Sequence, residues 1–61
     1  MNSDYKINEI DNEIQKIKKA ATKIEKLGGT IEAVRKNLVR LRASTKMLEL
    51  NISDVKLVND L

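Results

Sequence analysis

The sequence contains no cysteine and no histidine, and its one aromatic residue is Tyr5. Without cysteine there is no disulfide and no thiol nucleophile, and without either residue type the usual zinc ligands are missing. The absence of histidine also removes the commonest general base. A single tyrosine offers little surface on which nucleic acid bases could stack. We therefore expect a protein that is not an enzyme and that holds no cofactor and no metal.

Long apolar runs are also absent. No stretch approaches the ~18 apolar residues of a membrane span, and no signal-peptide pattern is present. We expect a soluble, cytoplasmic chain of 61 residues with no membrane span, forming one domain at most. Two helices that touch along one seam bury too little apolar surface to fold a chain of this length easily. A homo-oligomer is therefore the default expectation, and a bound protein partner is the other route to stability.

A strict heptad pattern occupies the first half of the chain. Its apolar residues are spaced alternately by three and four, with Ile7, Ile14 and Ala21 at position a and Ile10, Ile17 and Ile24 at position d. Such a narrow stripe is typical of a coiled coil, and isoleucine at both positions favours three or four helices in contact. Ser3 or Asp4 can cap this helix, which we expect over residues 4–27.

The same pattern continues in the second half. Ile31, Leu38, Thr45 and Ile52 occupy position a, whereas Val34, Leu41, Leu48 and Val55 occupy position d. We expect this helix over residues 30–57, capped by Thr30; a break at Asn51 is the alternative, since Asn, Ser and Asp favour caps over helix interiors. Thr45 is a lone polar residue in the row, and we expect it to bond a backbone carbonyl or to set the register.

Gly28 and Gly29 separate the two patterns. Gly28 can take the left-handed conformation that closes a helix, so residues 28–29 are expected to form the turn of a hairpin. The predicted fold is therefore all-α: one two-helix antiparallel hairpin domain over residues 1–61, self-associating into a four-helix bundle. One long coiled-coil helix is the alternative, because the stripe passes through the glycines with a three-residue stammer.

In this hairpin, positions a should face a, and d should face d. The charged e positions beside them then give two favourable pairs, Asp4–Lys56 and Glu25–Arg35. They also give two like-charge pairs, Asp11–Glu49 and Lys18–Arg42. We hypothesise that a second hairpin lying antiparallel alongside relieves both clashes.

Charge is unevenly distributed along the chain. Residues 16–46 carry a net charge of +8, whereas residues 1–15 sum to −3 and residues 47–61 to −2. A basic turn half can serve as a nucleic-acid surface, and it can equally be a solvated face. The residues predicted as phosphate contacts are Lys16, Lys19, Lys23, Arg35, Lys36 and Arg40.

A second apolar set lies off the heptad rows and comprises Met47, Leu50, Leu57 and Leu61, joined by Val58 and Tyr5. It is either a docking face for another protein or part of the contact between copies. The predicted oligomer or partner face consists of Ile7, Ile10, Ile14, Ile17, Ile24, Leu38, Leu41, Leu48, Met47, Leu50 and Leu57.

In outline, the length and the two expected helices resemble plasmid copy-control hairpins of the Rop type, although no residue motif carries the resemblance. We expect a coiled-coil protein-binding module that acts as a small regulatory protein, an inhibitor or an adaptor. The alternative is a Rop-like regulator that binds RNA or DNA through its basic face.

Overall fold

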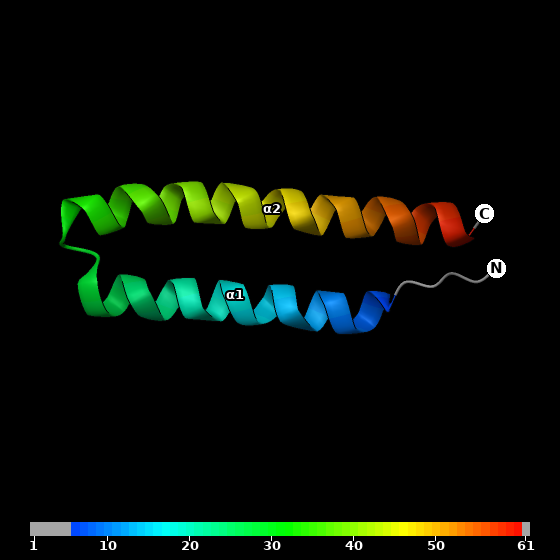
Figure 1. The fold of residues 1–61 in the computed structure, drawn as a ribbon, viewed down its shortest axis with the longest axis horizontal. Helices are drawn as coiled ribbons and strands as arrows, with labels where there is room; N and C mark the ends of the chain where they lie inside the picture. The colour runs from blue at the N-terminus through cyan, green and yellow to red at the C-terminus, as the bar shows by residue number, and fades with distance from the viewer. Residues whose placement is uncertain (1–5, 61) are drawn as a thin grey trace.

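Two helices packed side by side make up the fold. The computed structural model describes residues 6–60, with side chains to Leu57, and contains α1 (Ile7–Gly28) and α2 (Glu32–Asp60). The helices run antiparallel, so that the start of α1 and the end of α2 lie at one end of the rod and the turn lies at the other (Figure 1). The prediction of an all-α chain with two helices packed against each other is confirmed, and the alternative of one continuous helix is wrong.

The helix ends differ from the predicted ones. In α1 the first hydrogen bond of the helix runs from the Ile10 amide to the Lys6 carbonyl, 2.9 Å, and Lys6 provides no side-chain cap. The predicted cap residues Ser3 and Asp4 lie outside the described residues. At the other end, α2 continues without a break through Asn51 to Asp60, so the alternative of a break there is wrong.

The turn uses ordinary right-handed backbone. Gly28 is the last residue of α1, Gly29 has φ −68° and ψ −13°, and no residue in the described range has a positive φ. The prediction that Gly28 is left-handed is therefore wrong. The physical reason is that hydrogen bonds close the turn without a change of hand: the Gly29 amide donates to Glu25 O (2.8 Å), and the Ile31 amide donates to Gly28 O (3.0 Å).

The start of α2 lies two residues beyond the predicted one. Its first hydrogen bond runs from the Arg35 amide to the Ile31 carbonyl, 3.0 Å, which places Ile31 at the cap position. Thr30 lies in the turn before it, so the predicted cap by Thr30 is wrong. Glu32 is in the first turn of α2, where its carboxylate favours the positive end of the helix dipole.

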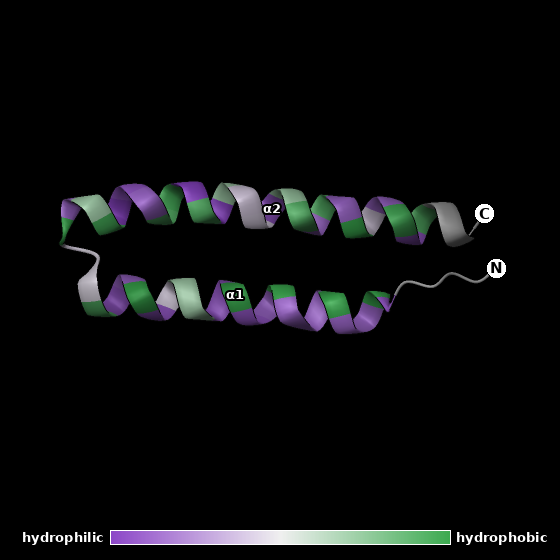
Figure 2. Cartoon of the chain, viewed as in Figure 1, coloured by the Kyte–Doolittle hydropathy of each residue, from purple (hydrophilic) through white to green (hydrophobic). Residues whose placement is uncertain are grey.

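The interior of the hairpin is formed by the residues at heptad position a, which we call the a row. Its buried members are Ile14, Ala21, Leu38 and Thr45, all 5% exposed or less; Ile7 and Ile52 are half-buried, and Ile31, next to the turn, is 57% exposed. The Thr45 Oγ1 donates to the Leu41 carbonyl at 2.7 Å, which confirms the predicted bond to the backbone. Figure 2 shows apolar bands recurring along both helices, in keeping with the heptad pattern. The core is therefore a single thin layer between two helices.

Candidate functional site

The residues at heptad position d, which we call the d row, are left partly exposed. Four large members of the row are between 37% and 45% exposed: Ile10, Ile24, Leu41 and Leu48. The remaining members, Ile17, Val34 and Val55, are half-buried. The residues of the predicted oligomer face therefore fall into two groups. Ile14 and Leu38 are buried inside the hairpin, whereas the d row is exposed to solvent and can contact another chain.

Helix geometry places the whole d row on one side of the hairpin. Position d is displaced from position a by about 60° around a helix of ~100° per residue. Because the two helices are antiparallel and the a rows face each other, the d residues of both turn to the same side. The e residues of both turn to the opposite side. We call the first side the d face and the second the e face.

Few charges border the d face. The g positions next to the d row, in the described residues, are Lys6, Glu13, Ala20, Leu27, Asn37, Ser44 and Asn51. Only the first two are charged, and both are at the start of α1. A border that is uncharged except at the start of α1 allows another helix to approach without the burial of unpaired charge. The d face is therefore suited chemically to contact with further helices.

Two ion pairs join the helices across the e face. The Lys18 ammonium lies 2.9 Å from the Glu49 carboxylate, and the Arg42 guanidinium lies 2.9 Å from the Glu25 carboxylate. Gln15 Nε2 also donates to Glu49, at 3.3 Å. The hydrogen bond from Arg42 lowers the pKa of Glu25, and the hydrogen bonds from Lys18 and Gln15 lower the pKa of Glu49.

These ion pairs correct the predicted pattern of charges. Lys18 and Arg42 do not clash, because each cation reaches a carboxylate one heptad further along the opposite helix. Glu25 pairs with Arg42 rather than with Arg35, and Asp4 lies outside the described residues. The clashes involving Lys18 and Glu49 are thus relieved within one chain and do not need a second copy. A search for opposite charges one heptad out of register could have found both pairs in the sequence.

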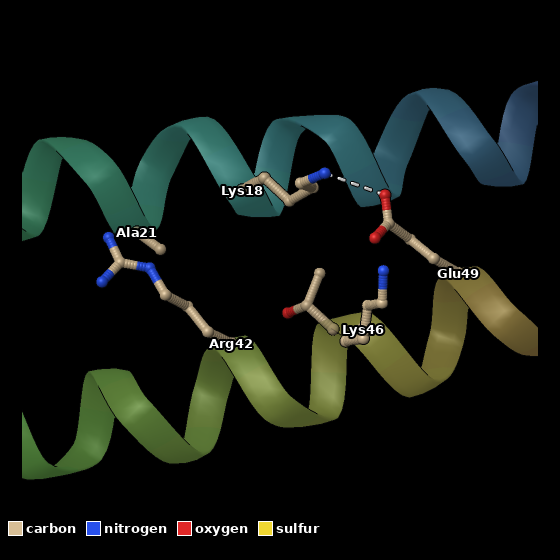
Figure 3. A pocket seen from close by; sticks show the side chains of 6 residues that line it. Lys18, Ala21, Arg42, Lys46 and Glu49 are labelled. Atoms are coloured by element: carbon tan, nitrogen blue, oxygen red, sulfur yellow. Dashed lines mark hydrogen bonds and ion pairs between the residues drawn. The ribbon is translucent and has the colours of Figure 1, made fainter.

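A hollow of about 240 Å³ lies on the e face between the helices. Ala21 and Thr45 leave the space, because both side chains are small, and Lys18, Arg42, Lys46 and Glu49 surround it (Figure 3). The figure shows Lys18 turned toward Glu49, to which it is bonded. Two of the three cations are thus already engaged with glutamates, and the hollow contains no nucleophile paired with a base.

No protein-family model, no curated protein and no solved structure matches this chain. Among the described residues no group of acidic residues is arranged to hold a metal ion, and neither helix has an apolar stretch long enough to cross a membrane.

The second apolar set lies on the outer side of α2. Met47, Leu50 and Leu57 are 56%, 46% and 63% exposed, and they occupy heptad positions c and f, which point away from α1. The side chain of Val58, and all of Tyr5 and Leu61, lie outside the described residues. The set is therefore separate from both the core and the d row.

The predicted phosphate contacts do not form one patch. Lys16, Lys19 and Lys23 occupy positions c and f of α1, whereas Lys36 and Arg40 occupy positions f and c of α2. In each helix these positions point away from the other helix, so the two groups lie on opposite edges of the hairpin. Arg35 is at position e. Two of the six cations are also engaged locally, Lys16 with Glu13 at 2.8 Å and Lys36 with Glu32 at 3.4 Å.

Proposed function

We propose that this chain is a non-enzymatic helical interaction module that self-associates through its d face. Two hairpins pack these faces together into a four-helix bundle, and the assembled bundle acts as a small regulator, inhibitor or adaptor. The observation that carries the proposal is the exposure of the d row, with Leu48 45% and Ile24 44% exposed in a single hairpin. The outer side of α2, with Met47, Leu50 and Leu57, remains free to bind a protein partner.

The exposed area of the chain supports this assembly. The chain exposes 5059 Å², whereas a compact monomer of 6.9 kDa is expected to expose about 4,000 Å². The excess of about 1,000 Å² is similar to the ~800 Å² that each partner buries in a standard interface. The hairpin as a whole therefore exposes, beyond what a compact monomer would, about the area that a stable dimer buries.

The chemistry of the d face favours a second copy as its occupant. A closed dimer with two-fold symmetry brings the same patch of both chains together, so that the patch has to complement itself. A row of isoleucine, leucine and valine bordered mostly by uncharged residues meets this condition. Isoleucine at both a and d in α1 also favours more than two helices around one core.

A pair of matched substitutions tests the proposal. Leu48 and Leu50 are on the same helix and are 45% and 46% exposed, but Leu48 belongs to the d row and Leu50 to the outer side of α2. Leu48→Glu places two charges in the proposed interface and is expected to raise the dimer dissociation constant at least ~100-fold. Leu50→Glu is expected to leave it unchanged.

Sedimentation equilibrium measures both effects directly. Circular dichroism at high concentration checks that both variants remain helical. If Leu50→Glu dissociates the assembly and Leu48→Glu does not, the contact lies on the outer side of α2 and the d face is not the interface.

Nucleic-acid binding is a second candidate function, favoured by one edge of α1. Lys16, Lys19, Lys23 and Lys26 form a single outward row over residues 16–26, which is about 15 Å of helix. Such a row can follow a phosphate backbone, and binding through it should fall steeply as salt rises. We expect Lys19→Ala with Lys23→Ala to weaken binding to double-stranded RNA or DNA in a gel-shift titration, with Lys36→Ala on the opposite edge as the control. Equal losses from both edges would show that the row has no special role.

A further inference from the structure

The charges of the hairpin are segregated along its length. Residues 16–46 form the half nearest the turn and carry a net charge of +8. At the open end, residues 6–15 and 47–57 together carry −3. Because the two helices are antiparallel and side by side, both contribute to each half (Figure 1). Each hairpin is therefore basic at one end and acidic at the other.

Symmetry leaves two ways to join the d faces of two such hairpins. In a two-fold dimer the axis can run along the helices, which puts both turns at the same end and α1 of one copy over α2 of the other. The axis can instead run across the helices, which puts the turns at opposite ends and α1 over α1. Neighbouring helices are antiparallel in both arrangements, so helix dipoles do not discriminate between them.

We infer that the turns lie at opposite ends, so that the basic half of each copy covers the acidic half of the other. This inference rests on the proposed self-association and specifies its geometry. With both turns at the same end, two halves of +8 would lie against each other, and like charges in apposition disfavour an interface. With the turns at opposite ends, the basic half of each copy, with a net charge of +8, lies against the acidic half of the other, with a net charge of −3. This attraction occurs twice and favours the complex.

Individual residues along the seam lead to the same arrangement. The middle residue of the d row in α1 is Ile17, so an axis through it aligns the two copies with the greatest overlap. Ile10 then faces Ile24 of the second copy, and at the outer border Glu9 faces Lys23 of the second copy on both sides of the axis. The Glu9–Lys23 pairs distinguish the two arrangements. Lys16 and Arg40 do not, because the same-end arrangement places Lys16 opposite Arg40 twice, whereas the opposite-end arrangement places Lys16 opposite Lys16 and Arg40 opposite Arg40 of the second copy.

The absence of cysteine allows a test with single labels. Thr30 lies in the turn and Asn51 near the open end of α2; both are exposed and uncharged, so their replacement leaves the charge pattern intact. With an axis near Ile17, Thr30 of one copy comes close to Asn51 of the other. Thr30→Cys and Asn51→Cys are each labelled with pyrene maleimide, whose excimer emission reports two labels in contact.

We expect excimer emission from the one-to-one mixture of the two labelled variants and none from either variant alone. Excimer emission from labelled Thr30→Cys alone would place the turns together and overturn the inferred orientation while leaving the dimer intact. A dimer in sedimentation that gives no excimer in any sample would also overturn the orientation. If sedimentation shows only monomer, the proposed self-association fails, and this inference fails with it.

Discussion

The Lys18 ammonium lies 2.9 Å from the Glu49 carboxylate, and this ion pair joins α1 to α2 on the side of the hairpin opposite the exposed d row. The Arg42–Glu25 pair does the same nearer the turn. The two sides of the hairpin therefore differ in kind. On the e face, ion pairs within the chain join the two helices. On the d face, aliphatic side chains remain in contact with solvent.

Acid is expected to weaken the hairpin. The pKa values of Glu25 and Glu49 lie below the ordinary value of 4.5 in the folded chain because these carboxylates accept hydrogen bonds from Arg42 and Lys18. A folded-state pKa below the unfolded one stabilises the native state above the unfolded value, and this stabilisation is lost as the pH falls through the folded pKa. We therefore expect the melting temperature, followed by circular dichroism, to fall below about pH 4.5.

The variant Glu49→Gln serves as the comparison for this effect. It should melt at a lower temperature than the unmodified chain at neutral pH and show a smaller decrease in acid. An acid dependence identical to that of the unmodified chain would mean that Glu49 does not contribute to it.

Reversal of Lys18 is expected to affect folding more than association. Lys18→Glu places a carboxylate beside Glu49 within the same chain, so the melting temperature should fall. The double variant Lys18→Glu with Glu49→Lys restores an opposite-charge pair and should recover most of the loss. Because the e face is not the proposed interface, the sedimentation of the double variant should match that of the unmodified chain. A change in its dimer affinity would show that Lys18 and Glu49 act between copies.

The two glycines of the turn are expected to respond differently to alanine. A methyl group at Gly28 would meet only Ile31 Cδ1, at 3.6 Å, and Gly28 is helical, so Gly28→Ala should stabilise the hairpin by about 0.5–1 kcal/mol. At Gly29 the added methyl would lie 2.5 Å from the Glu25 carbonyl oxygen. Gly29→Ala should therefore destabilise it. Urea unfolding measures both changes, and equal effects would contradict the described turn.

The a row and the d row are expected to have different roles in stability. Ile14 is 3% exposed, so Ile14→Ala leaves a cavity inside each hairpin and should cost about 2–4 kcal/mol of folding free energy. Ile24 is 44% exposed in one hairpin, so Ile24→Ala should act through the contact between copies. Helicity of Ile24→Ala should recover at protein concentrations that leave Ile14→Ala unfolded. The same concentration dependence for both variants would argue against this division.

Heptad spacing was sufficient to predict two helices and the rows along them, because periodicity depends only on local sequence. It could not show which row becomes the interior, since both rows are aliphatic apart from Thr45. The difference lies in size: Ala21 and Thr45 are small, so the helices can approach closely along the a row. The larger Ile10, Ile24, Leu41 and Leu48 lie on the d face of the hairpin, where they are partly exposed to solvent.

The helix ends and the ion pairs were less predictable. The chain closes α1 with right-handed glycines, whereas residue preferences favour a left-handed cap. The e-face ion pairs were missed because long side chains such as Lys18 and Arg42 reach a heptad beyond the residue directly opposite them.

Sedimentation equilibrium of the purified, nucleic-acid-free chain over a wide range of concentrations tests the central claim most directly. The exposed d row predicts a reversible assembly whose mass is twice that of the 6.9 kDa chain and whose helical content rises as the dimer forms. A folded monomer at every concentration would contradict the claim, because it would show that the d face remains uncovered without a second copy.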